Sequence, residues 1–454
     1  WTLAREYELS PEMLAMSHLW QAPGFAHCPV ACKGAPEAVA DLCHLTPEAA
    51  RTMLAQAESM AEQGLRVLAV ARAGHDDPSG PDIQHDFGFE FVGLVGLADP
   101  LRPEVPQAVA ECHAAGVRVV MITGDHPATA RAIAAEAGIP AERVLTGDEL
   151  ARLDDVELAR RVGAVDVFAR IAPAQKLRIV NAFSRHGDVV AMTGDGVNDA
   201  PALKAAHIGI AIGKRGTDVA REAADLVLVA DDFSAIVHAM RLGRGIYHNL
   251  VKAITYAIAA HLPIAGIAML PLLFGLPMML TPAHVAFLEL VISPTCSVVF
   301  EAEATPDRLM REPPRPREQA LFSFPTLLKG ALQGALVFGA TVLAYWLALR
   351  SGTTETAART VGFLALVLGN LGLVHVNRDW GQCRFSVNRT FAAVAAATLA
   401  LLALAIWQPL LARSFGFAPL SPQSCLLALV CALAGGIGSV LGGRFVDVLV
   451  KKHI

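Results

Sequence analysis

The sequence contains few charged residues, and no stretch of it is strongly basic. Lys, Arg, Asp and Glu make up 17% of the 454 residues, and the formal net charge is −5. A protein that binds nucleic acid through its phosphates needs clustered positive charge. We therefore expect no nucleic-acid partner.

Cysteine is sparse as well, and the spacing of the cysteines indicates no disulfide framework. Among the eight cysteines, Cys28 and Cys32 are close in sequence but have no second metal-type pair nearby. Cys296, Cys425 and Cys431 lie in apolar runs. We expect free thiols, as in a reducing compartment.

The N-terminus lacks both a secretory signal peptide and an initiating methionine. The chain begins abruptly at Trp1. Fragments and processed products begin in this way, so we expect the chain to be part of a longer protein.

Charge is distributed unevenly along the chain. Up to about residue 245 its density is ordinary, and Gly, Pro and Ala separate strand-like from helix-like stretches. Beyond that point long apolar runs dominate. This asymmetry indicates a soluble part followed by a part that spans a membrane several times.

The soluble part alternates between predicted strands and helices. Apolar and β-branched runs predict strands at 66–71, 89–97, 117–122, 189–192, 208–212 and 226–229. Capping residues and periodicity predict helices at 46–63, 103–115, 127–137, 173–186 and from Ala200, with Thr46 as the N-cap of the first. Such alternation predicts a doubly wound α/β sheet, in which the β-branched run 117–122 is a central parallel strand.

Two Thr-Gly-Asp turns follow predicted strands, at 123–125 and 193–195. Ligands of doubly wound sheets bind beyond the carboxyl ends of the strands. Glycine lets backbone N–H groups approach an oxygen-rich ligand, and the aspartates need a cation. Asp195 and Asp199 can face one Mg²⁺, and Lys176 supplies positive charge for a phosphoryl group. One such turn alone fits an ordinary loop, but two with a lysine between them favour a phosphate site.

The run 192–204, Met-Thr-Gly-Asp-Gly-Val-Asn-Asp-Ala-Pro-Ala-Leu-Lys, resembles the highly specific hinge signature of P-type ATPases. Further segments resemble this family in the expected order, and Arg66 matches an arginine near its nucleotide. These segments are 33–37 (Lys-Gly-Ala-Pro-Glu), 99–102 (Asp-Pro-Leu-Arg), 123–125 (Thr-Gly-Asp) and 169–176 (Ala-Arg-Ile-Ala-Pro-Ala-Gln-Lys). The resemblance covers the whole chain.

The resemblance implies three parts. Residues 1–97 would be the C-terminal part of an α+β nucleotide-binding domain. Residues 98–245 would be a haloacid-dehalogenase-like phosphorylation domain without its DKTGT strand, and 246–454 an all-α transmembrane domain of six helices. The implied activity is cation transport driven by ATP, with Mg²⁺ as cofactor.

The resemblance also implies roles for individual residues. Asp195, together with Asp199, would bind Mg²⁺. Asn198 and Asp199 would hold the phosphoryl site, and Lys176 would neutralise the transferring phosphate. ATP would be contacted by Lys33, Arg66, Arg102, Thr123, Gly124, Asp125 and Arg170.

The chain departs from the family pattern in what it omits. It contains no DKTGT string, which carries the family's nucleophile, and it lacks the TGE loop and the first four membrane helices. An aspartyl-phosphate route needs its nucleophile. We therefore expect weak Mg-nucleotide binding without turnover, and the missing N-terminal half of the pump as a partner.

A second departure concerns adenine. The segment 8–12 stands where related pumps place an aromatic residue and an arginine, but Leu9 cannot stack and Pro11 cannot pair. Either adenine is bound less tightly, or Phe25 substitutes.

Six apolar runs follow the hinge, at about 251–274, 284–300, 327–349, 361–376, 391–411 and 424–442. Heavy-metal pumps have two spans there, so the chain resembles the calcium, sodium/potassium and proton pump branch. Basic residues cluster after the second, fourth and sixth runs: Arg308, Arg311, Arg315, Arg317 and Lys329; Arg378, Arg384 and Arg389; Arg444, Lys451 and Lys452. The positive-inside rule then predicts a multi-pass membrane protein, in the plasma membrane, with the soluble part and the C-terminus cytoplasmic.

Polar residues inside spans indicate the transported ion's route. We expect His261, Glu289 and Ser293 to contribute, with Glu289 as the central ion-coordinating or proton-carrying group. Glu289 is the single carboxylate inside the apolar runs, whereas a hard divalent cation needs several oxygen ligands. We therefore do not expect a high-affinity calcium site. A proton or a monovalent ion, or a site completed by the missing helices, fits as well.

Prolines and amides also fall within the spans. We expect Pro263 to interrupt the first span, with Pro271 near its end, and Pro294 to free a carbonyl in the second. Asn370, His375 and Asn377 fit either an ion route or packing contacts between helices. For Glu301 and Glu303, at the inner mouth, a solvated face is the favoured interpretation.

Two other functions remain open at this point. One is a non-catalytic, nucleotide-binding membrane protein derived from half a pump. The other is a membrane-anchored phosphatase of the haloacid-dehalogenase type. That phosphatase would need an Asp-x-Asp or Asp-x-Thr nucleophile before the first Thr-Gly-Asp turn, and none is visible.

Overall fold

The structure is a computed structural model. It describes residues 1–10, 13–24, 27–213, 216–230, 232–275, 277–316, 320–378 and 389–452, except for the side chains of 296, 297 and 450–452. Pro11, Phe25, Arg317 and Arg384, named above, lie outside the described residues.

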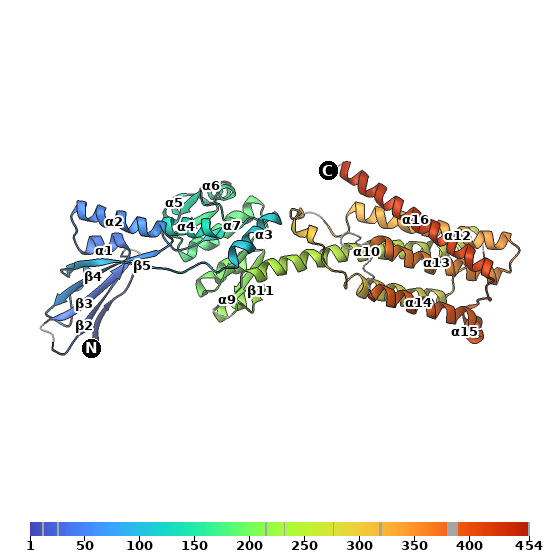
Figure 1. Cartoon of the computed structure of the whole chain (residues 1–454), viewed down its shortest axis with the longest axis horizontal. Coiled ribbons are helices and arrows are strands. Elements are labelled where there is room, and N and C mark those ends of the chain that lie inside the picture. The colour runs from blue at the N-terminus through green and yellow to red at the C-terminus, as the bar shows by residue number, and fades with distance from the viewer. Residues whose placement is uncertain are drawn as a thin grey trace. The chain divides into compact units, whose positions relative to one another are not determined.

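The chain forms two compact units that meet in sequence between His238 and Ala239. The first begins with a five-stranded antiparallel sheet in the order β1-β2-β3-β4-β5 (Figure 1). Its strands are β1 (Thr2–Tyr7), β2 (Ala15–Gln21), β3 (Cys28–Gly34), β4 (Arg66–His75) and β5 (Glu90–Leu97). Alternate residues of these strands point to one face, where Leu19, Val30, Ala71 and Phe87 form a buried core.

Two helices connect β3 to β4. They are α1 (Pro36–Leu42) and α2 (Pro47–Glu62). The Thr46 side chain accepts a hydrogen bond from the N–H of Ala49 at 3.3 Å, which confirms the predicted N-cap. The predicted helix 46–63 and strands 66–71 and 89–97 correspond to α2, β4 and β5, whereas β1–β3 and α1 were not predicted.

The rest of the first unit is α/β, as predicted, but it contains two small parallel sheets. One has the order β6-β8-β7 and the other β11-β10-β9. Their strands are β6 (Met121–Ile122), β7 (Val144–Thr146), β8 (Val167–Ala169), β9 (Ala191–Gly194), β10 (Ile208–Ile212) and β11 (Leu226–Leu228). The accompanying helices are α3 (Val105–Ala114), α4 (Pro127–Ala137), α5 (Gly147–Arg152), α6 (Asp155–Arg161), α7 (Pro173–His186), α8 (Ala200–Ala205) and α9 (Asp218–Ala223).

The expectation that 117–122 is a central strand is wrong for the described chain. Pairing is confined to Met121 and Ile122, and β6 lies at the edge of its described sheet. The segment is rich in β-branched residues because both of its faces pack against apolar cores. Val120 and Ile122 pack on one core, and Val119 and Met121 pack on another.

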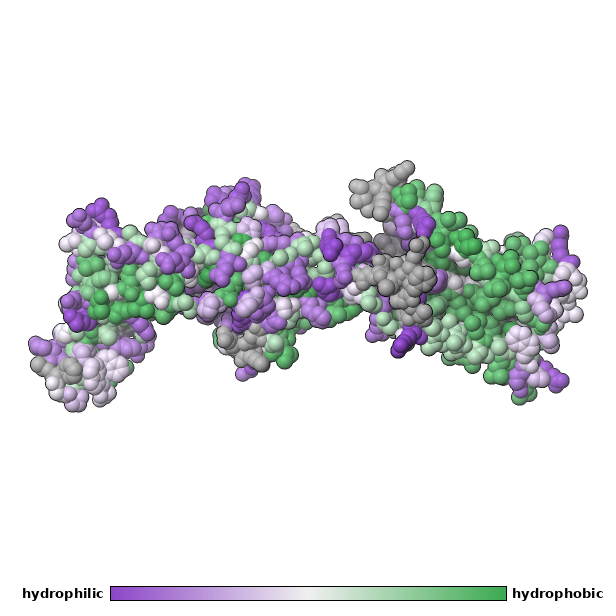
Figure 2. Space-filling model, in the orientation of Figure 1, coloured by the Kyte–Doolittle hydropathy of each residue, from purple (hydrophilic) through white to green (hydrophobic). Residues whose placement is uncertain are grey.

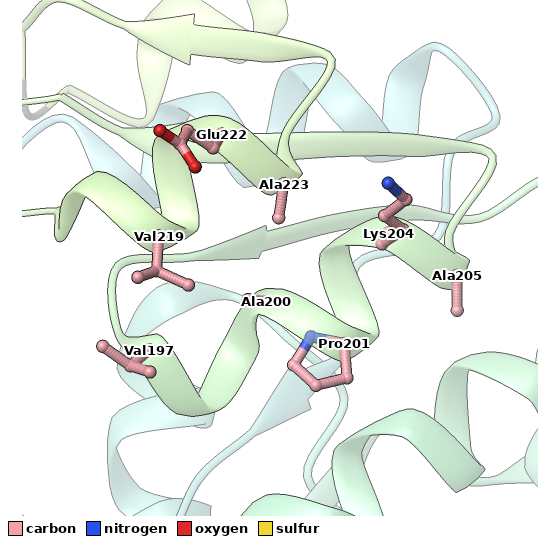
Figure 3. Close-up of a pocket in the computed structure, with 8 residues that line it drawn as sticks. All are labelled: Val197, Ala200, Pro201, Lys204, Ala205, Val219, Glu222 and Ala223. Carbon is pink, nitrogen blue, oxygen red and sulfur yellow. The ribbon is translucent and has the colours of Figure 1, made fainter.

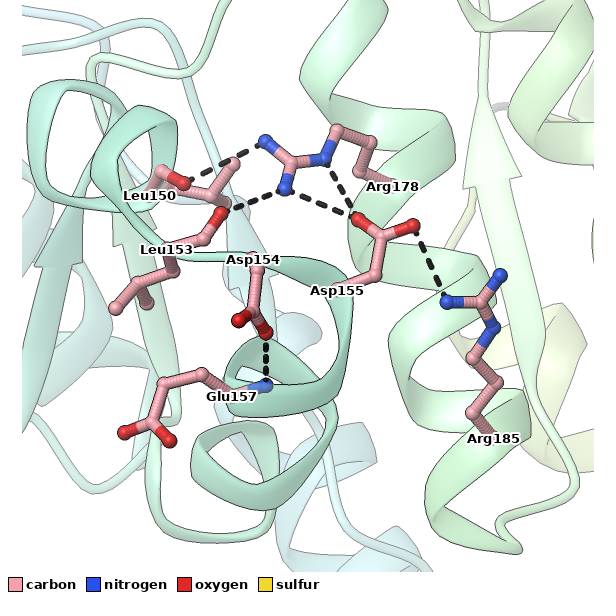
Figure 4. Close-up of polar contacts among 7 residues, drawn as sticks. All are labelled: Leu150, Leu153, Asp154, Asp155, Glu157, Arg178 and Arg185. Carbon is pink, nitrogen blue, oxygen red and sulfur yellow. Dashed lines mark hydrogen bonds and ion pairs between the residues drawn. The ribbon is translucent and has the colours of Figure 1, made fainter.

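An exposed ion-pair network ties α6 to α7 (Figure 4). Asp155 accepts hydrogen bonds from Arg178 at 3.0 Å and from Arg185 at 3.1 Å. Arg178 also donates to the carbonyl of Leu153 at 2.9 Å. The hydrogen bonds from Arg178, followed by the charges of both arginines, lower the pKa of Asp155. The network joins α6 to α7, the helix that carries Lys176.

The second unit is helical, and most of its surface in the view of Figure 2 is hydrophobic. Five helices are long and apolar enough to cross a membrane in the part of the chain that the structure describes. They are α10 (Ser234–Phe274), α12 (Phe324–Arg350), α13 (Glu355–Asn377), α14 (Arg389–Trp407) and α16 (Pro422–Lys452). A short helix, α15 (Pro409–Phe415), precedes α16.

The second predicted span has a mixed structure. Helix α11 (Pro282–Pro294) ends after 13 residues and continues as a π-helix from Thr295 to Val299. The wider turn begins directly after Pro294, whose ring removes a backbone donor. The proline predicted to disturb the first span has no such effect, because α10 is continuous through Pro263 and Pro271. Membrane helices tolerate proline where neighbouring groups satisfy the freed carbonyl.

Close packing joins α10 to α12 at Gly334. A Cβ atom at this position would lie 2.8 Å from the carbonyl oxygen of Ala259, a backbone atom that cannot easily move. Small residues allow such contacts in membrane helices. Helix α13 is the most buried span, with 72% of its apolar window inside the unit, so it forms the centre of the second unit.

A buried charge cluster lies around Glu303, the carboxylate for which a solvated face was expected. Its two oxygens contact Lys252 Nζ at 2.5 Å and Arg378 Nε at 3.0 Å, and its side chain is 7% exposed. The solvated interpretation is wrong for Glu303 and holds for the exposed Glu301. The cluster connects α10, the segment after α11 and the end of α13.

We predict that Glu303→Gln destabilises the second unit by about 3–5 kcal/mol, because it leaves two buried cations without their partner. Thermal unfolding of the chain in detergent measures this. The matched control is Glu301→Gln at an exposed position, where the expected change is within about 0.5 kcal/mol. Equal effects of the two substitutions would contradict the assignment of the cluster.

Candidate functional site

The hinge segment that follows β9 forms the centre of the site. Lys176 on α7 donates from Nζ to Oδ1 of Asp199 at 2.6 Å. The other oxygen of Asp199 accepts the N–H of Gly196 at 3.2 Å, so both carboxylate oxygens are engaged. The Asp199 side chain is 7% exposed, which strengthens its attraction to the lysine. The structure therefore brings together two residues that are 23 positions apart in sequence.

Glycine is required at position 194 for this arrangement. A Cβ atom there would lie 2.6 Å from the Cβ of Asp199 and 2.9 Å from its carboxylate. Any larger residue would displace Asp199 from Lys176. The glycine of this Thr-Gly-Asp turn thus serves close packing, in addition to the ligand approach predicted from the sequence.

Asp195 and Asn198 are exposed beside the buried pair. The backbone at Asp195 is held by its carbonyl, which accepts the N–H of Thr217 at 2.9 Å. Within the described residues, no three His, Cys, Asp or Glu side chains are grouped to hold a metal ion by themselves. An exposed carboxylate still fits Mg²⁺, because this ion usually takes one or two protein carboxylates and completes its shell with phosphate and water.

The first Thr-Gly-Asp turn is ordered by its own hydrogen bonds. The Thr123 hydroxyl donates to the Asp125 carboxylate at 2.9 Å and accepts the N–H of Asp125 at 3.1 Å. The carbonyls of Thr123 and Asp125 accept the N–H groups of Ile171 and Arg170, both at 3.0 Å. The turn is therefore fixed to the segment that leads to Lys176.

A cavity of about 400 Å³ joins several predicted nucleotide contacts. Arg66, Arg102, Asp125 and Thr193 line it, together with apolar residues of the first unit. Arg66 Nε lies 4.0 Å from Asp125 Oδ1, and the arginine side chain is 70% exposed. Lys33, Thr123, Gly124, Arg170 and Lys176 do not line this cavity.

Asp99 and Asp232 also line this cavity, and sequence reasoning gave neither of them a role. Asp232 accepts the hydroxyl and the N–H of Ser234 at 2.5 and 2.8 Å. These bonds lower the pKa of Asp232, and the positive charge of Arg102 lowers it further. The available signal was an aspartate two residues before the first serine of a long helix, a common pattern at helix starts.

The adenine side of the predicted site has no aromatic residue where the family pattern places one. Leu9 is 60% exposed. Tyr7 is not a substitute, because it lies in the core and donates its hydroxyl to the carbonyl of Pro81 at 2.6 Å. Lys33 is exposed on β3, between Met16 and Val70 on the neighbouring strands. The question about Phe25 falls outside the described residues.

A larger groove of about 640 Å³ is lined by residues of the hinge, α8 and α9 (Figure 3). Val197, Val219 and Pro201 line it, with Lys204 and Glu222 as the charged residues of its lining. Both valines are about half exposed, at 54% and 46%. Few polar groups line the groove, so it suits an apolar partner rather than a phosphate group.

In the second unit, the structure pairs two of the predicted ion-route residues. His261 Nε2 lies 3.0 Å from Glu289 Oε1, and both side chains are about half exposed, at 50% and 46%. Ser293, one turn after Glu289, is exposed as well. The pair therefore lies on an outer face of the unit.

The amides of α13 differ in their contacts. Asn377 donates to Gln333 on α12 at 3.0 Å, which confirms the packing interpretation for this residue. Asn370 is 1% exposed, and neither of its amide atoms has a hydrogen-bond partner within the described residues. A buried amide without a partner is costly, so Asn370 is a candidate ligand for an ion or a water molecule.

Comparisons with known proteins agree with this division of the chain. Residues 19–207 match the family model of haloacid dehalogenase-like hydrolases, and residues 277–438 match that of the C-terminus of cation transporting ATPases. The first match contains both Thr-Gly-Asp turns and Lys176. The second contains Glu289 and Asn370.

Similar proteins include calcium-transporting ATPase 1 of Yarrowia lipolytica, which is 36% identical over 74% of this chain. A calcium-transporting ATPase of Bacillus subtilis is 39% identical over 70% of the chain, and human calcium-transporting ATPase type 2C member 2 is 36% identical over 70%. The matched parts make up 38%, 36% and 33% of these relatives, so the chain spans about a third of their length. The two family matches, the relatives and the hinge geometry together show that the chain belongs to the P-type ATPase family and corresponds to the C-terminal half of such an ATPase.

Proposed function

We propose that this chain forms the C-terminal half of an ATP-driven cation pump. The observation that carries the proposal is the buried Lys176–Asp199 pair beside the exposed Asp195, at the carboxyl end of β9. This arrangement offers a positive charge and an exposed carboxylate at one place, as phosphoryl transfer with Mg²⁺ requires. The soluble unit and the C-terminus would face the cytoplasm, and the membrane would be the plasma membrane.

The residues of the first unit divide the work of phosphoryl transfer. Asp195 would hold Mg²⁺, which would neutralise charge on the phosphoryl oxygens when bound. Asn198 would donate to a phosphoryl oxygen, and Lys176 would compensate developing negative charge while Asp199 keeps its ammonium group in place. Arg66, Arg102 and Asp125, which line the 400 Å³ cavity, would position the nucleotide.

The nucleophile would come from the N-terminal half of the pump. No Asp-Lys-Thr-Gly-Thr string is present in the sequence. Within the described residues, β6 and β9 each have one strand edge without a partner, and each leads into a Thr-Gly-Asp turn. A further parallel strand between them would deliver a carboxylate beside Lys176 and Asp195.

The second unit would carry the transported cation past Glu289. Ionisable residues within membrane spans usually face protein or a water-filled route rather than lipid. The half-exposed His261–Glu289 pair therefore supports a partner that covers this face, which the missing membrane helices would supply. Ser293, one turn after Glu289, offers a neutral oxygen, and the buried Asn370 on α13 offers another in the same unit. With one carboxylate, the route suits a proton or a monovalent cation better than a tightly bound divalent cation.

For the chain alone in detergent, we predict Mg²⁺-dependent ATP binding without turnover. Asp195→Asn should weaken this binding at least about tenfold, which corresponds to about 1.4 kcal/mol. Asp188→Asn, at a half-exposed loop aspartate paired with His186, should leave it unchanged. Radiolabelled ATP should give no acid-stable, hydroxylamine-sensitive phosphoenzyme, and the appearance of one would show that the nucleophile lies in this chain.

In the full-length pump, we predict that Glu289→Gln abolishes the ion dependence of ATPase activity, because it removes the carboxylate from the spans. The measurement is ATPase activity as a function of cation concentration and pH. Glu355→Gln, which alters a surface pair with Arg359, is the matched control. Unchanged ion dependence in Glu289→Gln would exclude this residue from the ion route.

A further inference from the structure

Polar contacts join the two parts of the first unit near the predicted nucleotide contacts. Arg170 donates from Nη2 to Oε1 of Glu37 at 2.5 Å. The Thr129 hydroxyl donates to the carbonyl of Leu65 at 3.0 Å. The Glu37–Arg170 contact therefore lies between the five-stranded sheet region and the α/β region.

The backbone at Arg170 is held in one conformation. Its φ angle is +52°, in the left-handed region that residues other than glycine seldom adopt. Its N–H donates to the carbonyl of Asp125, and its own carbonyl lies 2.2 Å from where a Cβ atom of Gly147 would stand. These contacts fix the backbone from which the guanidinium group reaches Glu37.

The Glu37–Arg170 pair contributes little to the stability of the fold. Its side chains are 33% and 44% exposed, and ion pairs exposed to this degree contribute little to stability. His126 interacts electrostatically with Arg170, Glu37 and Glu58, so Glu58 is a second carboxylate in this neighbourhood. A guanidinium group binds phosphate and carboxylate oxygens with similar geometry.

We propose that Glu37 is an internal competitor of the nucleotide. In the absence of ligand, its carboxylate occupies the guanidinium group of Arg170. Nucleotide phosphates must displace Glu37 from Arg170 in order to bind there. Glu37 thus lowers the nucleotide affinity, because Arg170 can bind phosphate only after its contact with Glu37 is broken. This inference rests on the proposed function, which places the nucleotide at the 400 Å³ cavity lined by Asp125, the residue whose carbonyl accepts the N–H of Arg170.

The test uses the full chain in detergent, with Mg²⁺ and trinitrophenyl-ATP as the probe and unlabelled ATP as its competitor. Glu37→Gln should bind about three- to fivefold more tightly than the wild type, the loss of one exposed ion pair. Glu37→Asp, which keeps the charge but is one methylene shorter, should also bind more tightly. Glu58→Gln is the matched control and should bind within twofold of the wild type.

A double-variant cycle separates competition for Arg170 from a general effect of charge. Arg170→Ala should weaken binding, and adding Glu37→Gln to it should change nothing further. An equal gain from Glu37→Gln with and without Arg170 would overturn the proposal. So would unchanged or weaker binding in Glu37→Gln while Arg170→Ala still weakens binding, although the proposed function would then stand. Absence of ATP-competable binding in the wild type would instead refute the proposed function itself.

Discussion

The ion pair between Lys176 and Asp199 is the interaction on which the site depends. It is short, nearly buried, and satisfied on both carboxylate oxygens. It connects α7 to the hinge and so fixes the turn from which Asp195 and Asn198 extend. Lys176 compensates the negative charge of Asp199, whereas Asp195 in the same turn is exposed. The same contact thus orders the loop and separates a structural carboxylate from an available one.

The second unit uses charge in a parallel way. Glu303 is buried between Lys252 and Arg378, where it holds three helical segments together. Glu289, by contrast, is half exposed and is paired with His261. In each unit one carboxylate, Asp199 or Glu303, is buried and paired with basic side chains. A second carboxylate in the same unit, Asp195 or Glu289, is more exposed and can bind a ligand. This division supports the assignment of Asp195 and Glu289 to function.

Much of this could be predicted from the sequence, because strand, helix and motif signals are local. The bounds of α4 and α7 and five of the six predicted spans follow from capping residues and hydrophobic runs, whereas the second predicted span is a short helix continued by a π-helix. The burial of Glu303 could not be predicted, because it depends on Lys252 and Arg378, which are distant in sequence. The edge position of β6 was missed because a β-branched run reports burial of two faces, not the number of neighbouring strands. The Glu37–Arg170 contact likewise joins segments 133 residues apart.

The central claim is that this chain supplies the Mg²⁺ and phosphate-binding half of a site whose nucleophile lies elsewhere. It is tested most directly by joining the chain to the N-terminal part of its Bacillus subtilis relative and incubating the product with radiolabelled ATP. The account predicts a hydroxylamine-sensitive phosphoenzyme on the added part, which is lost when Lys176 is replaced by alanine. A folded chimera that forms no phosphoenzyme, or one whose phosphoenzyme is indifferent to Lys176, would contradict it.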